Sequence, residues 1–569
     1  MYNDTSEFNT ATTKRKGESI HMKKVLTMMA AITAVVFMTT GAHAQQAALI
    51  GKVSSAEEPV MEGVLVSAKK DGGTITITVV SNDKGQYTFP ASKVSPGHYT
   101  ITTRAAGYDL DGPKDATVAA GKATTADIKL KKTRNLANQL SNAEWLVSMP
   151  GDDKQKSFLN GCVGCHTLQR IVSSNHTAEE FQQIFKRMGS YSPGSTPTHP
   201  QPLLPGPRGD RSPVAANQMK PASEYLAQVN LSEQQTWEWP LKTLPRPKGR
   251  ATHVIITEYD LPRPDAQPHD VIMAADGTIW YSDFGSQFIG KMDPKTGKAK
   301  DYEVPVLKDD EPRGSLEIEA APDGTIWASM MYQAGILKFD PKTEKMTTYP
   351  VPKEWQSTST QESMVFPNYS DKDGYVWTNN QETHVIYRVN VKTGKYEDMG
   401  VMTDASGKQI SAYGMPADHD NGLYLLEFGG TSIGHFNPNT KVVEIFKTPS
   451  AGSKPRRGRV DDQNRLWFAE YGNNAIGMFD PKTKAIKEWQ VPTAWSDPYD
   501  VVPTKKGDVW AGSMFNDQVA RLDTKTGNFV EYLLPRRTNI RRTFFDDAGN
   551  ALWIGSNHGG SIVKVEALD

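Results

Sequence analysis

The chain has 569 residues, too many for one ordinary domain, and its 64 basic and 65 acidic side chains give a formal net charge of −1. No run of like charge exceeds a few residues, so the basic surface typical of nucleic-acid-binding proteins is absent. Glycine, proline and tryptophan are frequent, which favours turn-rich β structure over helical bundles. The composition therefore predicts a multidomain, mainly β protein with no nucleic-acid partner.

The N-terminal residues 1–44 have the pattern of an export signal. A positive start at Lys23-Lys24 precedes the apolar run 25–40, and Ala42-His43-Ala44 supplies the small residues of a cleavage site. The apolar run is short for a membrane span. We expect translation to start at Met22, cleavage to follow Ala44, and the mature protein to be periplasmic or secreted with no membrane span. The alternative is an uncleaved N-terminal anchor.

Residues 47–132 alternate apolar and polar side chains with a period of two, which is typical of half-buried strands. Several short strands within one such segment predict a small β-sandwich. The strands are expected at 48–53, 64–69, 74–81, 87–90, 99–104 and 125–130. The motifs Gly85-Gln86-Tyr87-Thr88-Phe89 and Ala106-Gly107-Tyr108 resemble those of the carboxypeptidase regulatory-like domain. That resemblance implies a non-catalytic sandwich used for display or contact.

Residues 135–235 are predicted to form a short helical domain that holds haem. The chain has two cysteines, and both lie in Cys162-Val163-Gly164-Cys165-His166. C-x-x-C-H is the attachment signature of c-type haem, in which Cys162 and Cys165 bind the porphyrin covalently and His166 is the proximal iron ligand. The alternatives are a redox C-x-x-C pair and half of a zinc site, which would need two further ligands. His176 and His199 are the histidines nearby.

Two methionines are candidates for the sixth, distal iron ligand. Met219 precedes the expected last helix, 222–229, as the ligand does in class I cytochrome c, which the segment resembles. Met188 ends a helix that should begin at Thr177 with a capping box to Glu180. The order of these elements also resembles the haem domains of quinohaemoprotein amine dehydrogenases, and that resemblance favours Met188. Either methionine could instead be ordinary apolar packing.

After a linker at 236–252, residues 253–569 form a repeat array. The element Gly-x-aliphatic-Trp recurs at intervals of 43 to 50 residues, as at Trp280, and a turn such as Asp293-Pro294-Lys295-Thr296-Gly297 follows the aromatic residue by 13 positions. Seven such units predict a seven-bladed β-propeller. The last unit lacks its closing strand, and residues 256–262 have the missing pattern. We therefore expect that strand to complete the last blade.

The array resembles streptogramin lyases of the virginiamycin B lyase type, on motifs such as Asp276-Gly277-Thr278-Ile279-Trp280 and Leu466-Trp467-Phe468-Ala469-Glu470. The resemblance implies a propeller that opens a cyclic depsipeptide by elimination, with a histidine base and Mg²⁺ near carboxylates. His269 matches the base. Asp283 matches the metal-site carboxylate. The residues at the position of Asp283 in other repeats include Glu427 and Glu470, so carboxylates that suit Mg²⁺ or Ca²⁺ could ring one channel mouth.

The array departs from the lyase pattern at the second histidine. At a fixed spacing from each aromatic residue, the positions that correspond to His269 are Leu316, Phe366, Tyr413, Arg456, Tyr499 and Arg542, and His558 lies at a different offset. Four arginines instead bring positive charge to the expected channel: Arg456, Arg457, Arg541 and Arg542. They favour an anionic ligand. Alternatively, they pair with Glu427, Glu470 and Asp283.

Three functions follow from these patterns. The first is electron transfer between a haem and an unidentified redox partner, coupled to a substrate or ligand in the propeller channel. The second is a lyase acting on a cyclic ester, with the haem as an accessory. The third is a non-catalytic periplasmic binding protein whose sandwich and propeller display surfaces.

Overall fold

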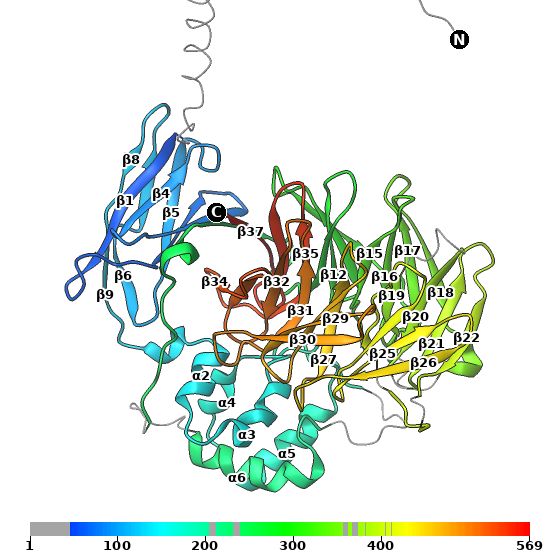
Figure 1. Cartoon of the computed structure of the whole chain (residues 1–569). Coiled ribbons are helices and arrows are strands. Elements are labelled where there is room, and N and C mark those ends of the chain that lie inside the picture. Colours follow the sequence, from blue (N-terminus) through cyan, green and yellow to red (C-terminus); the bar gives the residue numbers. More distant parts are fainter. Residues whose placement is uncertain are drawn as a thin grey trace, which may run out of the picture. The chain divides into compact units, whose positions relative to one another are not determined.

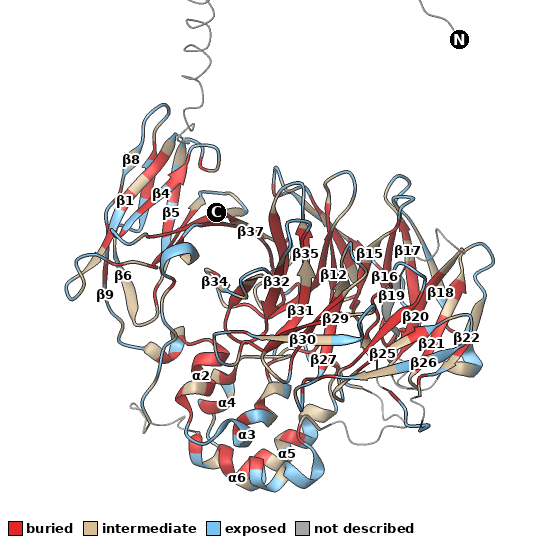
Figure 2. Cartoon of the chain, viewed as in Figure 1, coloured by how far each residue is buried: buried red, intermediate tan, exposed pale blue. Residues whose placement is uncertain are grey.

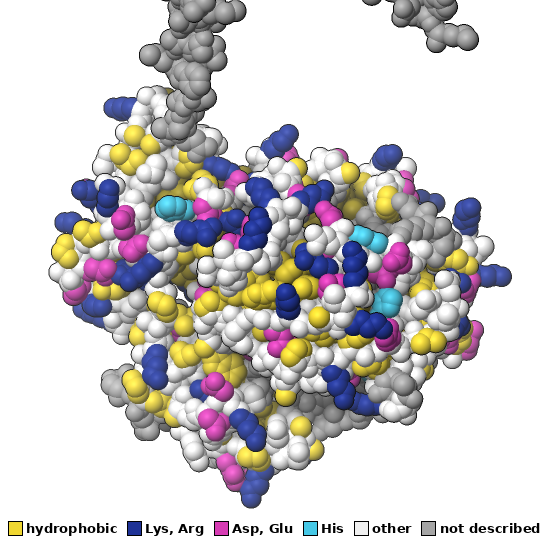
Figure 3. All heavy atoms as spheres, in the orientation of Figure 1, with side chains coloured by type: hydrophobic (Ala, Val, Ile, Leu, Met, Phe, Trp, Pro, Cys, Tyr) yellow, Lys and Arg dark blue, Asp and Glu magenta, His cyan; other side chains and the backbone are white. Residues whose placement is uncertain are grey.

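The computed structural model describes residues 46–203, 212–230, 239–356, 374–381, 383–403, 406–410 and 412–569, and only the backbone of 362–366. Residues 47–569 form one compact unit that is mainly β (Figure 1). No helix in these segments combines the length and the apolar character needed to span a membrane. On the face shown in Figure 3, basic and acidic side chains are interspersed. The predicted signal segment and the residues before it, 1–44, lie outside the described residues.

The N-terminal segment is a two-sheet sandwich. One sheet has the order β4-β1-β9-β6, with β8 beside β1, and the other contains β3-β2-β5-β7. Alternating side chains of these strands are buried, and the core between them includes Leu49, Val66, Tyr87, Phe89 and Ile101. The strands are β1 (Ala47–Ser55), β2 (Leu65–Lys70), β3 (Ile75–Val80), β4 (Gln86–Pro90), β5 (Gly97–Arg104), β6 (Tyr108–Gly112), β7 (Asp115–Val118), β8 (Thr124–Thr125) and β9 (Ile128–Lys132).

The middle segment is helical. Its α-helices are α2 (Asn142–Ser148), α3 (Asp153–Lys156), α4 (Leu168–Val172), α5 (Ala178–Gly189) and α6 (Met219–Val229). The predicted capping box is present at the start of α5, where the Thr177 side chain accepts from the Glu180 backbone and the Glu180 carboxylate accepts from the Thr177 backbone. The buried side chains of this segment, among them Trp145 and Leu168, share one apolar core with Tyr499 and Met514 from the C-terminal segment. The helices are therefore packed on the C-terminal sheets.

The C-terminal segment contains six separate four-stranded antiparallel sheets among its described residues (Figure 1). Their strands are β11 (Pro268–Met273), β12 (Ile279–Asp283), β13 (Phe288–Met292), β14 (Ala299–Glu303), β15 (Ile318–Ala320), β16 (Ile326–Ser329), β17 (Gly335–Asp340), β18 (Lys345–Pro350), β19 (Glu362–Phe366), β20 (Tyr375–Asn380), β21 (Val385–Asn390), β22 (Tyr396–Val401), β23 (Ala412–Gly414), β24 (Leu423–Glu427), β25 (Ser432–Asn437), β26 (Val442–Lys447), β27 (Pro455–Val460), β28 (Leu466–Glu470), β29 (Ala475–Asp480), β30 (Ala485–Gln490), β31 (Pro498–Pro503), β32 (Asp508–Ser513), β33 (Gln518–Asp523) and β34 (Phe529–Leu533).

The repeated sequence elements explain this regularity. The second strand of each sheet is buried along its length (Figure 2), because it lies between neighbouring sheets and carries the aromatic residue of the repeat; Trp280 and Trp327 are at most 2% exposed. The turn that follows is fixed by its first aspartate. In the first sheet, Asp293 accepts from the Lys295 backbone and the Thr296 hydroxyl, both at 2.8 Å, and Gly297 takes the positive φ that ends the turn.

The predicted closing strand is confirmed. β10 (Val254–Asp260) pairs with β37 (Ser561–Ala567), next to β36 (Ala551–Ser556) and β35 (Ile540–Asp546). The other edge of β10 pairs with β3 of the sandwich, from Ile255 opposite Val79 to Tyr259 opposite Ile75. This second pairing was not predicted. It joins sandwich and C-terminal segment into one eight-stranded sheet and protects an edge that would otherwise be open.

Candidate functional site

The first strands of the C-terminal sheets lie side by side in chain order, and the contact of β11 with β35 closes the series. Pro268 on β11 lies opposite Asp283, and the residues at the same register on the other first strands include Ala412, Pro455, Pro498 and Ile540. Most of these strands have a bulge just after this position. The next two residues of each strand therefore form two successive layers of side chains.

We call one set the motif-side layer: His269, Tyr413, Arg456, Tyr499 and Arg541. The other set is the ion-pair layer: Asp270, Glu317, Arg457, Asp500 and Arg542, together with Glu319 and Arg459, which lie two positions further along their strands. This register corrects two sequence assignments. Phe366 pairs with Trp377 and so corresponds to Ile272, and Arg541 rather than Arg542 corresponds to His269. A fixed spacing failed because the hairpins of these two sheets are longer.

The ion-pair layer joins arginines to carboxylates. Arg457 donates to both oxygens of Asp270, at 2.8 and 3.0 Å, and to Glu317 at 3.2 Å. Arg542 donates to Asp270 at 3.1 Å and also to Glu319. Arg459 contacts Asp500, at 3.2 Å. The suggested pairing of Arg457 and Arg542 with Glu427, Glu470 and Asp283 is therefore wrong. Burial raises the pKa of Glu317 to about 7, so this carboxyl is partly protonated near neutral pH.

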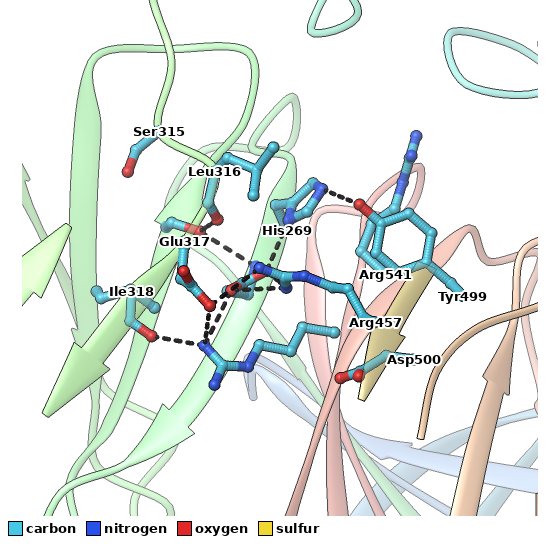
Figure 4. Close-up of polar contacts among 12 residues, drawn as sticks. His269, Ser315, Leu316, Glu317, Ile318, Arg457, Tyr499, Asp500 and Arg541 are labelled. Atoms are coloured by element: carbon cyan, nitrogen blue, oxygen red, sulfur yellow. Dashed lines mark hydrogen bonds and ion pairs between the residues drawn. The ribbon is translucent and has the colours of Figure 1, made fainter. Parts of the chain in front are cut away.

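His269 links the two layers. Its Nδ1 donates to Asp270 at 2.7 Å, and the Tyr499 hydroxyl donates to its Nε2 at 3.0 Å (Figure 4). The Tyr413 hydroxyl in turn bonds to that of Tyr499. Burial lowers the pKa of His269 to about 3, against the opposing effect of Asp270, so the imidazole is neutral at neutral pH. Both ring nitrogens are occupied and the side chain is fully buried.

Arg456 lies in a cage of aromatic rings. Its guanidinium carbon is 4.0 Å from the ring centre of Tyr499, 4.3 Å from Phe428, 4.4 Å from Tyr471 and 5.2 Å from Tyr413. One of its nitrogens is 3.5 Å from the Met514 sulfur. The sequence interpretation missed this cage. Its signal is the fourth residue after the aromatic position of each repeat, which is Phe428, Tyr471 or Met514 in three successive sheets.

The C-x-x-C-H motif contacts the rim of these sheets. Arg541 donates to the Gly164 carbonyl at 3.1 Å, and His558 lies 3.3 Å from the same oxygen. Asn539 donates to the Val163 carbonyl at 3.2 Å. Burial and the nearby Arg541 lower the pKa of His558 to about 4, so it is a neutral donor here. Residues from the last C-terminal sheet thus hold the backbone of the motif.

The motif's own groups fit covalent haem. Cys162 and Cys165 are both free, and burial raises the pKa of each thiol, that of Cys162 to about 12. His166 Nδ1 lies 3.1 Å from the Thr167 carbonyl, to which it can donate, and in that tautomer Nε2 carries the lone pair that a metal would need. The described residues contain no cluster of three or more His, Cys, Asp and Glu side chains suited to a metal. The zinc alternative therefore lacks its further ligands in this part of the chain.

The two methionine candidates differ in their surroundings. Met219, the first residue of α6, packs against the apolar core that also contacts Cys162. Met188 lies near the C-terminal end of α5, is partly exposed, and is not among the described members of that core. His176 lies 3.7 Å from Glu180, and the His199 backbone closes a turn with Thr196. Both side chains are partly exposed, and the difference is that Met219 packs on the core that Cys162 also contacts. The sixth ligand, Met188 or Met219, stays a prediction.

The structure does not gather the three carboxylates predicted to bind a cation. Asp283 pairs with Arg263 at 2.5 Å and accepts from backbone amides, and Glu427 has Lys408 at 3.9 Å. Glu470 accepts from Asn473 at 3.1 Å, and burial raises its pKa to about 8. Each carboxyl group thus has partners of its own near the end of its strand. The predicted magnesium or calcium site finds no ligand cluster in the described chain.

Comparisons with known proteins agree with part of this architecture. Residues 405–568 match the virginiamycin B lyase family, and residues 48–131 match the carboxypeptidase regulatory-like domain. No curated protein matches the chain. A streptogramin B lyase structure is 21% identical with a TM-score of 0.48, over 56% of this chain and 99% of that one. The virginiamycin B lyase from Staphylococcus aureus is 20% identical with a TM-score of 0.48, over 55% and 99%.

A third similar structure is the extracellular domain of a putative one component system from B. thetaiotaomicron, 16% identical with a TM-score of 0.41, over 52% of this chain and 40% of that one. Neither family match covers the helical segment that contains the C-x-x-C-H motif. Residues 405–568 are thus similar to the virginiamycin B lyase family, and the N-terminal sandwich is similar to carboxypeptidase regulatory-like domains.

Proposed function

We propose that this protein is an exported, periplasmic or secreted c-type cytochrome whose haem exchanges electrons with a ligand bound at a seven-bladed propeller. One observation carries the proposal. Arg541 and His558, both from the last C-terminal sheet, contact the Gly164 carbonyl between the two haem-binding cysteines. The haem attachment segment and the channel layers are therefore in direct contact. A haem that merely accompanied the propeller would not require this contact.

Cys162 and Cys165 would hold the haem, and His166 would bind its iron, with Met219 or Met188 as the sixth ligand. The group supplies one-electron chemistry when bound. The chain's own residues keep the attachment segment against the C-terminal sheets. Arg541 lies over the ring of Tyr499, 5.4 Å from its centre, and the Tyr499 hydroxyl bonds to the neutral His269 and to the Tyr413 hydroxyl. The electron partner is a small metabolite or a second redox protein.

The lyase alternative is supported by the family match over residues 405–568. It requires a histidine that can take a proton from a substrate. His269 is the histidine at the expected position, but both of its nitrogens are hydrogen-bonded and its side chain has no exposed surface. A base in this state would have to give up the Tyr499 bond before it could act. This geometry favours electron transfer over elimination.

The test uses the full chain produced together with a c-type haem maturation system. The oxidised protein is mixed with a panel of small alcohols, amines, aldehydes and hydroxy acids, and haem reduction is followed by absorbance. We expect reduction by at least one compound, and slower reduction in His269→Gln. No reduction across the panel would refute a small-molecule donor. Turnover of a cyclic depsipeptide that is lost in His269→Ala, with the haem spectrum intact, would establish the lyase instead.

A further inference from the structure

The two arginines of the motif-side layer differ from those of the ion-pair layer in charge compensation. Arg456 and Arg541 are 7% and 4% exposed, and among the described residues neither has an ion pair with a carboxylate. The Nε atom of each is buried without a hydrogen-bond partner, but so is that of Arg542 in the ion-pair layer, so the difference lies in the missing carboxylates. Figure 4 shows Arg457 directed at Glu317, whereas Arg541 points away from it. Two buried positive charges thus lie at the motif side of the channel.

The neighbouring residues cannot supply the missing negative charge. In the ion-pair layer, Asp270, Glu319 and Asp500 balance three arginines, and Glu317 is partly protonated near neutral pH. His269 and His558 are neutral, because burial lowers the pKa of each. The layer is therefore balanced without any carboxylate left for Arg456 or Arg541.

Aromatic rings, the Met514 sulfur and, for Arg541, the Gly164 carbonyl are neutral groups, so they compensate the two positive charges only in part. A cation–π contact contributes about 0.5 to 2 kcal/mol, whereas burying a charged side chain costs several kcal/mol even after the protein has relaxed. Arg456 has four such contacts, but Arg541 has only two more distant ones, at 5.4 Å from Tyr499 and 5.5 Å from Phe284. Buried charges in proteins are usually paired, so an uncompensated charge of this kind indicates that a ligand supplies the opposite charge.

The two guanidinium groups are close enough to act on one group. Both have a nitrogen near the Met514 sulfur, at 3.5 Å for Arg456 and 3.9 Å for Arg541, and both lie over the ring of Tyr499. Guanidinium groups bind carboxylates in a planar, two-point arrangement. The surrounding Phe428, Tyr471 and Met514 would contact an apolar portion next to that carboxylate.

We propose that Arg456 and Arg541 form a binding site for the carboxylate of an organic acid, next to the Gly164 backbone of the C-x-x-C-H motif. The inference deepens the proposed function, since it names the chemical class of the group bound at the channel. Two sources supply this chemistry: a free carboxylic acid that exchanges electrons with the haem, or a propionate of the haem itself.

The first arm of the test is calorimetric titration of the full chain with acetate and with benzoate. A free-acid site predicts binding of at least one probe by the natural protein and a dissociation constant at least tenfold higher in Arg456→Gln and in Arg541→Gln. Arg465→Gln is the matched control, because Arg465 pairs with Asp461 on the same sheet as Arg456 but outside the channel. The dissociation constant of the acid should be the same for Arg465→Gln as for the natural protein.

The second arm measures the reduction potential of the haem against pH in the same proteins. If a haem propionate is the partner, the natural protein binds neither probe. Arg541→Gln then lowers the potential and raises the pH at which the potential changes, because the propionate loses its cation. If the natural protein binds neither probe and the potential is unchanged in both variants, the inference is refuted.

A third measurement separates binding from a structural role. Arg456→Met removes the charge with little change in volume, so it should raise the unfolding temperature of the ligand-free chain and abolish any rise caused by the acid. A fall in the ligand-free unfolding temperature would mean that the cage stabilises the fold through Arg456. A chain that carries no haem would refute the proposed function alone, because the titration and the unfolding measurement need no haem.

Discussion

The two layers of the channel are adjacent in sequence and opposite in character. Arg456 and Arg457 follow each other on β27, and Arg541 and Arg542 follow each other on β35. In each pair the second arginine binds carboxylates. The first is surrounded by aromatic rings and sulfur in one pair and contacts the C-x-x-C-H motif in the other. The ion-pair layer therefore compensates its own buried charges, whereas the motif-side layer holds the two arginines proposed to bind a carboxylate.

The largest expected effect is the loss of one arginine from the ion-pair layer. Arg457→Met leaves the carboxylates of Asp270 and Glu317 buried without this partner, so we expect the free energy of unfolding to fall by about 3–5 kcal/mol. Denaturant unfolding measures it. Arg456→Met is the matched control from the adjacent position and should not destabilise the ligand-free chain. If Arg457→Met and Arg456→Met reduce the free energy of unfolding equally, the two layers do not differ in charge compensation.

The second effect depends on pH. The pKa of Glu317 is about 7 in the folded chain, above its value of 4.5 in the unfolded chain, so between pH 4.5 and 7 the unfolded state loses this proton first. The stability of the natural protein relative to Glu317→Gln should therefore fall over that range, by up to about 3 kcal/mol, and level off above it. Unfolding at several pH values checks this. A relative stability that rises with pH would mean that Glu317 is an ordinary ionised partner of Arg457.

A smaller effect is expected within the motif-side layer. Tyr499→Phe leaves the buried Nε2 of His269 without its donor, which should reduce the free energy of unfolding by about 1–3 kcal/mol. Tyr413→Phe keeps the bond between Tyr499 and His269, so it should reduce the free energy of unfolding less. If Tyr413→Phe reduces the free energy of unfolding more than Tyr499→Phe does, the bond between Tyr499 and His269 is not what stabilises the motif-side layer.

The smallest expected effect concerns the contact between the last C-terminal sheet and the C-x-x-C-H motif. His558→Ala removes one hydrogen bond to Gly164, for which we expect a loss of about 0.5–1 kcal/mol. Hydrogen exchange should accelerate at residues 162–166 and stay unchanged in the sandwich. His98→Ala is the control, since His98 pairs with Asp71 on an exposed surface of the sandwich. Unchanged exchange at the motif in His558→Ala would show that Arg541 and Asn539 suffice to hold it.

Much of the fold could be predicted from local sequence patterns. The repeats with their turns predicted the separate four-stranded sheets, and the incomplete last repeat predicted the pairing of β10 with β37. The six strands expected in the sandwich are present, although β6, β7 and the separate β8 were missed. The pairing of β3 with β10 could not be predicted, because it joins two edges more than 170 residues apart with no shared local pattern.

The site was harder to predict than the fold. The sequence pointed to His269 and to the arginines, but fixed spacing assigned Arg542 to the wrong layer because one hairpin is a residue longer. It also grouped Asp283, Glu427 and Glu470 as ligands of one cation, whereas each has partners within its own neighbourhood. Sequence spacing gives the sheet and strand of a residue, while its partners across the channel depend on bulges and hairpin lengths.

The central claim is that the C-x-x-C-H motif carries one haem beside the channel. Intact mass measurement of the denatured full chain, produced with a c-type haem maturation system, tests it most directly. We predict a mass increase of one haem per chain, which maps to the peptide containing Cys162 and Cys165 and disappears in the Cys162→Ala, Cys165→Ala double variant. An unmodified mass with two titratable thiols would contradict the claim.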